Sequence, residues 1–491
     1  MKNRDSTKLI ALGIISLTFF LYSYWLNLSR PGVYYEKGWY GWYDQSQYLQ
    51  MAQDMASFSL AGGHYVYGLG YPVLGAIFYN IYPLDPFLIP NAVIFICTIL
   101  LTYLTARKYL SEELSIFSSL VLLFATPLIN YVTVPWSSTV SLFCLSILFY
   151  IVSNGVRSKF TSALVGICFA WTFSARFVDA VFLVPLAVAF FIESKNEKNF
   201  ARDIVIAVIS AGIIVSIVLF TQQVYFGSPF RTPYSDSQEH DYPGLGIFDI
   251  SRIPDSLFSV IINPFMKYDQ VEAPLLLSAF IFIFSPLGVI SMLKTKQRLV
   301  WLALLLGFIM AIFFYSSFIA FGAYNLKYWC IHYIKMWFPA LSILSVSGVF
   351  YLLSQKSNVY SSLFLILLVV SSLLVISSLL SVQHDGSLPV ITLTTDKDAY
   401  KMGENITIST LLRNLNGTGI RSKKIICLMD SIDMHGSYVS HTIHLEDQGD
   451  GYYVGTYFLD KYSPVDANSD GWMVKVMYAG RMAEKGIVLN H

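Results

Sequence analysis

Charge is scarce in this sequence of 491 residues: Asp, Glu, Lys and Arg make up 13% of it, against about 25% in ordinary soluble domains. Hydrophobic residues make up 55%, and the formal net charge is only +1. So small a net charge gives no sign of a nucleic-acid partner. Low charge combined with long apolar runs excludes a single soluble domain and indicates a protein that crosses a membrane several times.

Cysteine is equally sparse, and its spacing excludes two classes of site. The five cysteines are Cys97, Cys144, Cys168, Cys330 and Cys427. None has the spacing of a metal site, and no disulfide framework is visible. We expect most of these thiols to lie buried in apolar segments.

What the sequence has in quantity is apolar runs of spanning length. The basic N-terminus MKNRDSTK precedes a run without a small-residue cleavage site, which predicts an uncleaved first helix. A shorter apolar piece at 71–83 is expected to be interfacial or re-entrant. About eleven transmembrane helices are predicted in total. They lie near 9–29, 87–106, 113–132, 138–153, 160–175, 177–193, 204–222, 273–293, 299–318, 330–353 and 360–382.

The short linkers that follow from this assignment fix an orientation. With the N-terminus in the cytoplasm, every short basic linker falls on the cytoplasmic side, as the positive-inside rule requires. The loops 30–86 and 223–272 and the C-terminal region then lie outside. The basic linker residues are Arg107, Lys108, Arg157, Lys159, Lys195, Lys198, Arg202, Lys294, Lys296, Arg298 and Lys356.

The composition changes near residue 386, which divides the chain into a membrane domain (1–383) and an extracytoplasmic domain (384–491). The second domain reads as short alternating strands separated by turns, which predicts an all-β sandwich. Its sequence resembles an immunoglobulin-like module of the macroglobulin or bacterial surface type. It shows no catalytic cluster, so a structural or spacing role is expected. The strands are predicted at Val390–Leu393, Ile406–Leu412, Lys424–Met429, Tyr438–His444, Tyr452–Leu459 and Trp472–Met477.

The first external loop holds the stretch with the most chemical information, WYGWYDQSQYLQMAQDMASFSLAGGHYVYGLGYP at 39–72. It carries Asp44 among aromatic residues, and apolar residues from Tyr48 onward recur at helical spacing, which predicts a short helix on the membrane surface. A glycine-rich turn with His64 and a Tyr-Gly-Leu-Gly-Tyr-Pro segment follow. Position alone leaves Asp44 open to two interpretations, an ordinary loop acid or a catalytic group at the bilayer face.

Four segments resemble the GT-C class of membrane glycosyltransferases, in the branch of the protein O-mannosyltransferases and related archaeal and bacterial enzymes. In that branch an acid and a surface helix open the first external loop, an Arg stands at an outer helix junction, and a Phe-Gly-Ser-Pro turn opens a later loop. The segments are YDQSQYLQMAQDM with YGLGYPVLGAIF, FAWTFSARFVDAVFLVPLAV, VYFGSPFRTPYSD and YIKMWFPALSILS.

The resemblance implies a transferase that takes a sugar from a polyprenyl phosphate at the outer interface. It assigns the general base for the acceptor hydroxyl to Asp44, with inversion at the anomeric centre. The departing phosphate needs positive charge, for which Arg176 is the best-placed candidate. A purely structural ion pair of Arg176 with Asp179 is the alternative.

The sequence also departs from the family pattern. Ser137 and Ser138 stand where a second acid is common, so we expect no metal and no cofactor. Lys335 stands where Arg is usual, as a phosphate contact without bidentate geometry. His332 lies about one turn from Lys335 and so shares its face, and the two residues are alternatively polar groups within the bundle.

The remaining predicted substrate contacts are Tyr48, His64, Tyr67 and Arg231. His64 borders the apolar re-entry and is otherwise an exposed turn residue. Arg231 belongs to a mixed charged cluster that alternatively forms a solvated loop surface. The acceptor, whether protein, lipid or glycan, is not identified by the sequence.

Two rival functions remain open. The first is a multi-pass transporter or flippase for lipid-linked sugars, although no internal repeat typical of transporters is visible. The second is a surface anchor for the β domain, for which one helix would suffice. The expected location is the cell membrane of an archaeon or bacterium, with the N-terminus cytoplasmic.

Overall fold

A computed structural model describes helices in the N-terminal part of the chain and strands in the C-terminal part, and these form two compact units. We describe each unit by itself. The predicted domain boundary at 383–384 and the predicted span 360–382 lie outside the described residues. The described residues are 2–26, 43–59, 65, 67–125, 128–129, 132–155, 158–194, 199–230, 253, 275–317, 333–354, 390–401, 404–413, 418–419, 426–432, 438–458, 472–478 and 481–489.

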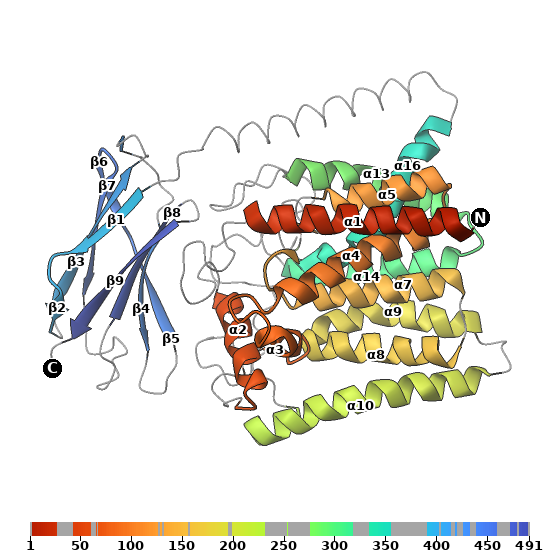
Figure 1. Ribbon diagram of the computed structural model, residues 1–491, viewed down its shortest axis with the longest axis horizontal. Coiled ribbons are helices and arrows are strands. Elements are labelled where there is room, and N and C mark those ends of the chain that lie inside the picture. The colour runs from red at the N-terminus through yellow and green to blue at the C-terminus, as the bar shows by residue number, and fades with distance from the viewer. Residues whose placement is uncertain are drawn as a thin grey trace. The chain divides into compact units, whose positions relative to one another are not determined.

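The helical unit is a bundle of long helices that run side by side, with two short helices, α2 (Tyr43–Ala56) and α3 (Pro72–Tyr79), at one end (Figure 1). α3 has eight residues, too few to span, as expected for the apolar piece at 71–83. The long helices are α1 (Lys2–Leu26), α4 (Leu88–Ala106), α5 (Glu112–Leu123), α7 (Ser138–Asn154), α8 (Lys159–Ala175), α9 (Phe177–Ser194), α10 (Phe200–Phe226), α13 (Leu275–Leu293), α14 (Arg298–Ser317) and α16 (Phe338–Ser354), the last preceded by the 3-10 turn η4 (Lys335–Trp337).

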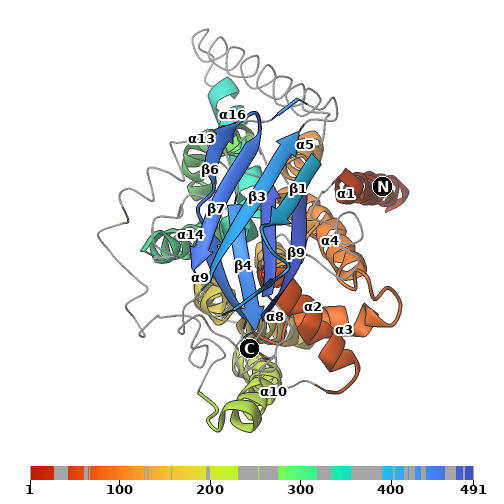
Figure 2. The ribbon, with the colours of Figure 1, turned by 90° about the vertical axis from the view of Figure 1, so that its left-hand side faces the viewer.

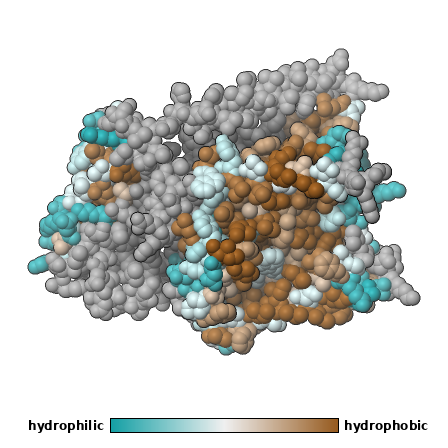
Figure 3. Space-filling model, viewed as in Figure 1, coloured by the Kyte–Doolittle hydropathy of each residue, from teal (hydrophilic) through white to brown (hydrophobic). Residues whose placement is uncertain are grey.

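Apolar residues cover much of the side of this bundle that Figure 3 shows, as a bilayer requires. On α10, Ile213 and Phe220 have exposed fractions of 60% and 71%. Within the described residues, five helices are long and apolar enough to cross a membrane, and they are Ser6–Leu26, Leu88–Ala106, Phe200–Phe226, Arg298–Ser317 and Lys335–Ser354. The chain is therefore a polytopic helical membrane protein, and the number of about eleven spans stays a prediction.

One predicted span is not a single helix. In the run at 113–132, α5 ends at Leu123, and Leu128, Ile129 and Val132 are helical again. Pro127 lies between these stretches in the sequence, and a proline disfavours helical geometry at the residue before it. The hydropathy of the run does not show this interruption.

Small residues let some of the helices pack closely. A Cβ added at Gly288 would clash with the carbonyl oxygen of Leu344, and one at Gly348 with that of Phe284, so α13 and α16 touch through their backbones. Ser285 and Ser345 share a hydrogen bond of 2.9 Å in the same contact. Such close contacts between small residues hold helices together where lipid offers no hydrophobic gain.

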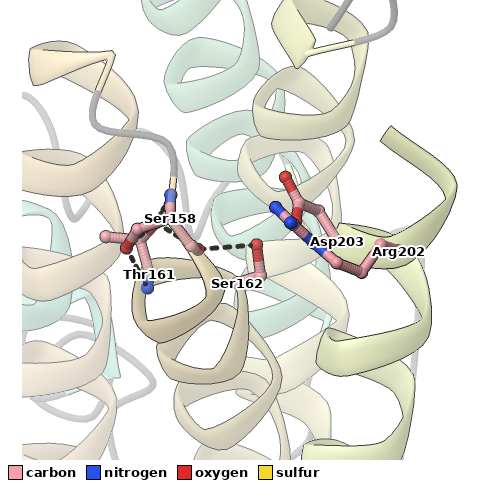
Figure 4. Close-up of polar contacts among 5 residues, drawn as sticks. All are labelled: Ser158, Thr161, Ser162, Arg202 and Asp203. Atoms are coloured by element: carbon pink, nitrogen blue, oxygen red, sulfur yellow. Dashed lines mark hydrogen bonds and ion pairs between the residues drawn. The ribbon is translucent and has the colours of Figure 1, made fainter. Parts of the chain in front are cut away.

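The described basic residues of the short linkers adjoin the helix ends away from α2. Ser158 and Thr161 form a capping box at the start of α8, and Ser162 bonds back to the Ser158 carbonyl at 3.1 Å. Beside them Arg202 donates from Nε (3.1 Å) and Nη2 (2.9 Å) to Asp203 Oδ1 (Figure 4). These basic residues therefore share one end of the bundle, as the predicted orientation requires.

The second unit consists of two sheets whose inner residues form one core. Most strand pairs are antiparallel, and β2 with β9 is parallel. Figure 2 shows β3, β7 and β4 among its strands. The first sheet has the order β1 (Val390–Thr395), β3 (Asn405–Arg413), β7 (Tyr452–Phe458), β6 (Glu446–Gly449). The second has the order β2 (Ala399–Tyr400), β9 (Arg481–Leu489), β8 (Trp472–Tyr478), β4 (Ile426–Ile432), β5 (Tyr438–Ile443).

The core between the sheets follows from the alternation in the strands. In β3, Ile406 and Ile408 are fully buried and join Val474 and Val476 of β8 and Tyr400 of β2. The all-β prediction is confirmed, with β2, β6 and β9 in addition to the predicted strands. The likeness to immunoglobulin-like modules stays a prediction.

Candidate functional site

Helix α2 presents one buried face to the rest of the helical unit. Gln45, Tyr48, Met51 and Ala52 are buried, with the spacing of one side of a helix. The helix predicted for this stretch is present, and it begins at Tyr43, so Asp44 lies in its first turn. The catalytic role of Asp44 remains a prediction.

Tyrosine side chains fasten α2 to the neighbouring elements. The ring of Tyr48 lies 4.8 Å from that of Tyr67 and 5.2 Å from that of Tyr71, measured between centroids. The Tyr48 hydroxyl donates to Ser137 Oγ at 2.9 Å, just before α7, and the Tyr71 hydroxyl donates to Asn91 Oδ1 at 3.1 Å. Two predicted contacts, Tyr48 and Tyr67, are thus neighbours.

The glycines of the Gly-Leu-Gly-Tyr-Pro segment have a steric role. A Cβ at Gly68 or Gly70 would clash with the backbone of Ser174 or Ala175 at the end of α8. The Gly70 amide donates to the Ser174 carbonyl at 3.1 Å, and Trp171 Nε1 donates to the Gly70 carbonyl at 2.8 Å. The segment therefore brings Tyr67 and Tyr71 against the end of α8, where Arg176 follows.

Arg176 stands between α8 and α9, and three neighbours contact its guanidinium. Its Nε lies 3.1 Å from Asp179 Oδ2, its Nη2 donates to the Tyr315 hydroxyl at 3.0 Å, and its Cζ lies 4.5 Å from the centre of the Tyr333 ring. Ser141 Oγ donates to Asp179 Oδ2 at 2.5 Å, and the Tyr315 hydroxyl donates to Asp179 Oδ1. The Arg176 side chain keeps 17% exposure, while that of Asp179 has none.

Lys335 lies in the same region, in the turn η4 before α16. It is fully buried, and its Nζ donates to Thr139 Oγ1 in the first turn of α7 at 2.9 Å. Lys335 interacts electrostatically with both Arg176 and Asp179. Lys335, Arg176 and Asp179 thus form one cluster of charged groups at this end of the bundle.

A further buried acid, Asp85, lies just before the start of α4. Its carboxylate accepts from the Tyr24 hydroxyl at 2.7 Å and from the Phe87 amide at 3.1 Å. Burial raises the pKa of the Asp85 carboxyl to about 7, in spite of these two hydrogen bonds. Asp85 thereby ties the end of α1 to the start of α4.

The structure brings together four of the predicted contacts, Tyr48, Tyr67, Arg176 and Lys335. The side chain of Asp44 is not described, and His64, Arg231 and His332 lie outside the described residues. Sequence reasoning missed Tyr315, which lies in an apolar segment and belongs to no motif, and it gave no role to Tyr333, although Tyr333 begins the segment YIKMWFPALSILS. Within the described residues, no three His, Cys, Asp or Glu side chains gather as a metal site would need.

The sequence matches no protein-family model and no curated protein. Solved structures do match. ArnT from Cupriavidus metallidurans bound to undecaprenyl phosphate is 12% identical, with a TM-score of 0.51 over 74% of this chain and 62% of ArnT. AglB, the oligosaccharyltransferase of Archaeoglobus fulgidus in complex with an inhibitory peptide and a dolichol-phosphate, is 12% identical, with a TM-score of 0.44 over 73% of this chain and 52% of AglB.

The fold assignment is based on the first of these structures. The chain spans less than two thirds of the length of ArnT, and the low identity means that the likeness concerns the path of the backbone. The helical unit of this protein has the GT-C fold of membrane glycosyltransferases.

Proposed function

We propose that this protein is a membrane glycosyltransferase that uses a sugar linked to a polyprenyl phosphate. The observation that carries the proposal is the fixed, partly exposed guanidinium of Arg176 at the α2 end of a GT-C fold. The solved structure of ArnT, which has this fold, contains bound undecaprenyl phosphate. A cation held in this way suits the phosphate of such a lipid.

Arg176 is proposed to bind the donor phosphate and to stabilise the charge that develops on it as the sugar leaves. Asp179 lies at ion-pair distance from Nε, and Nη2 donates to the Tyr315 hydroxyl. The Nη1 edge of the guanidinium is proposed to face the phosphate. Lys335 remains a proposed second contact of the phosphate, and the structural pairing of Arg176 with Asp179 is compatible with the role of Arg176.

Asp179 and Tyr315 are proposed to act through Arg176. The hydroxyl of Tyr315 both donates to Asp179 and accepts from Arg176, so the three groups form a closed set. Held from two sides, the guanidinium loses little freedom when the phosphate binds, and orientation fixed in advance lowers the barrier.

Asp44 is proposed as the general base. Its carboxylate takes the proton of the acceptor hydroxyl, the hydroxyl oxygen bonds to the anomeric carbon, and the bond from that carbon to the phosphate oxygen breaks with its electrons on the phosphate. Attack opposite the phosphate inverts the anomeric centre. The rings of Tyr48 and Tyr67 lie beside this region and suit packing against a sugar.

The proposed reaction takes place at the outer face of the cell membrane, with the lipid tail in the bilayer. The acceptor is a hydroxyl of a protein, lipid or glycan. His64, Arg231 and His332 remain proposed substrate contacts on the resemblance alone, and the donor is a co-substrate, so neither a metal nor a cofactor is proposed.

A donor-consumption assay tests this proposal. Purified protein in liposomes is given decaprenyl phosphate linked to mannose, glucose, galactose or arabinose, with membranes of a deletion strain as acceptor. Release of decaprenyl phosphate with transfer of one of these sugars is expected. Movement of intact lipid-linked sugar across the bilayer without transfer would contradict the proposal and favour a flippase.

A further inference from the structure

The amide of Gln45 is the feature that the proposed reaction does not yet use. Gln45 is fully buried in the first turn of α2. Of the side chains that the structure describes, it alone has two buried polar atoms, Oε1 and Nε2, without a hydrogen-bond partner. Buried polar groups are nearly always bonded, because removing them from water without a partner is unfavourable. Among the described residues, nothing satisfies the hydrogen-bonding groups of this amide.

The position of Gln45 points to the proposed donor site. Gln45 and Tyr48 are three residues apart on the buried face of α2, so their side chains are neighbours. Tyr48 in turn bonds to Ser137 and lies close enough to Arg176 to interact with it electrostatically. Gln45 is thus about 4.5 Å along the helix axis from Tyr48, a neighbour of the proposed phosphate site. A sugar attached to that phosphate would lie at a comparable separation from it.

The chemistry of the amide selects the class of group that it binds. An amide offers two N–H donors and one carbonyl acceptor, whereas a phosphate or carboxylate oxygen only accepts and a lipid tail does neither. Hydroxyl groups both donate and accept, and adjacent hydroxyls on a sugar ring satisfy both ends of an amide. On the same helix, Gln50 has a protein partner, Asp54, at 2.8 Å. Gln45 has none among the described residues.

We infer that Gln45 binds hydroxyl groups of the donor sugar and so contributes to the choice of sugar. The inference rests on the proposed function and deepens it. Hydroxyl groups also occur on sugar acceptors, so the test measures donor binding with no acceptor present.

The test compares two lipids on three proteins. Decaprenyl phosphate and decaprenyl phosphate linked to mannose, glucose, galactose or arabinose are titrated onto the wild-type protein, Gln45→Met and Gln53→Met. Gln53 is the matched control, since it lies on the exposed face of the same helix. The wild-type protein should bind at least one sugar-linked lipid more tightly than decaprenyl phosphate. Gln45→Met should bind that sugar-linked lipid about tenfold more weakly than wild type, because a lost hydrogen bond has roughly this effect. Its affinity for decaprenyl phosphate should stay within about twofold of wild type.

Gln53→Met should bind both lipids as the wild type does. Equal binding of both lipids by Gln45→Met and wild type would overturn the inference, and so would an equal loss on both lipids. Gln45→Met should also unfold at a temperature no lower than wild type, because the amide has no protein partner to lose. A variant that fails to fold would make Gln45 structural and would overturn the inference.

Monodeoxy analogues of the best-bound sugar provide a measurement that needs no variant. One or two of them should bind the wild-type protein about tenfold more weakly, with no further loss in Gln45→Met. Equal binding of every analogue by the wild type would overturn the inference. A protein that transfers sugar but shows no dependence on residue 45 would leave the proposed function standing, whereas a wild type that neither binds nor consumes any sugar-linked lipid would end both.

Discussion

At the scale of single residues, the surroundings of Arg176 separate it from the other arginines. Arg176 and Arg202 each contact an aspartate close in sequence, but at opposite ends of the bundle. Arg202 donates twice to one oxygen of Asp203 beside a helix start (Figure 4), whereas Arg176 contacts Asp179, Tyr315 and Tyr333. Arg202 is therefore a control, within the same chain, for the proposed role of Arg176 in binding the donor phosphate.

Replacing each arginine by glutamine should affect the rate of sugar transfer very differently. Arg176→Gln should reduce sugar transfer by about a hundredfold or more, since a positioned cation supplies much of the stabilisation of a leaving phosphate. Arg202→Gln should retain transfer within about threefold, in line with the small contribution of an exposed ion pair. Steady-state rates with the lipid-linked donor measure both.

A second variant tests how Arg176 is held. Tyr315→Phe removes the hydroxyl contacts with Asp179 and Arg176 and keeps the ring. It should lower kcat by about tenfold and leave KM for the donor near wild type, because orientation matters most in the transition state. A raised KM with unchanged kcat would contradict the assignment.

The residues of the site could be predicted only in part. Asp44, Tyr48 and Arg176 stand in recognisable segments, so the sequence indicated them. Tyr315 lies 139 residues after Arg176 inside an apolar helix, and nothing local marks its contact. The burial of Gln45 was equally hidden, because glutamine in a helix beside a membrane normally faces water.

At the scale of elements, the hydropathy of the chain located its helices well, because a segment in lipid must satisfy its own backbone and remain apolar throughout. It did not predict the interruption after Leu123, before Leu128 and Ile129 are helical again. Nor did it predict which helices touch, which depends on glycines such as Gly288 and Gly348.

Substitution of Gly288 tests the contact between α13 and α16. Gly288→Val should lower the free energy of unfolding by about 1–3 kcal/mol or more, because its Cβ would overlap the carbonyl of Leu344. Gly212→Val is the control, since no atom lies within 4 Å of a Cβ there. The thermal unfolding temperature in detergent should be clearly lower for Gly288→Val than for Gly212→Val. An equal decrease in the two variants would refute the contact.

Asp85 makes the stability of the contact between α1 and α4 depend on pH. Its pKa is raised from the ordinary 3.8 to about 7 by burial, so the folded state binds more protons than the unfolded state between these values. The stability that Asp85 contributes is therefore fully present below about pH 4 and is lost as pH rises through about 7. The unfolding temperature of the wild type minus that of Asp85→Asn should decrease as pH is raised from 4.5 to 7.5. A difference that stays constant over this range would contradict the shift.

At the scale of the whole molecule, the GT-C fold and the distribution of charge suggest one orientation in the membrane. The basic residues gather at the end of the bundle opposite α2, as predicted from the short linkers. The strands of the second unit were predictable from alternation, but β9 was not, because RMAEKGIVL mixes charges and glycine into the pattern. The site requires α2 to face outward.

Labelling of single cysteines tests this orientation. In a background without the native cysteines, Ser59→Cys after α2 and Lys296→Cys between α13 and α14 are both at exposed positions. A membrane-impermeant maleimide should label position 59 on intact cells and position 296 only after permeabilisation. The reverse pattern would place α2 in the cytoplasm and remove the basis for an outer-face reaction.

The most direct test of the account is the rate of sugar transfer by Asp44→Asn beside Asp54→Asn. Both changes neutralise an acid in α2, and Asp54 contacts Gln50 through an oxygen that asparagine retains. Asp44→Asn should transfer sugar roughly 10²–10⁴-fold more slowly, as expected for loss of a general base, and Asp54→Asn within about threefold of wild type. Transfer by Asp44→Asn at the wild-type rate would contradict the account.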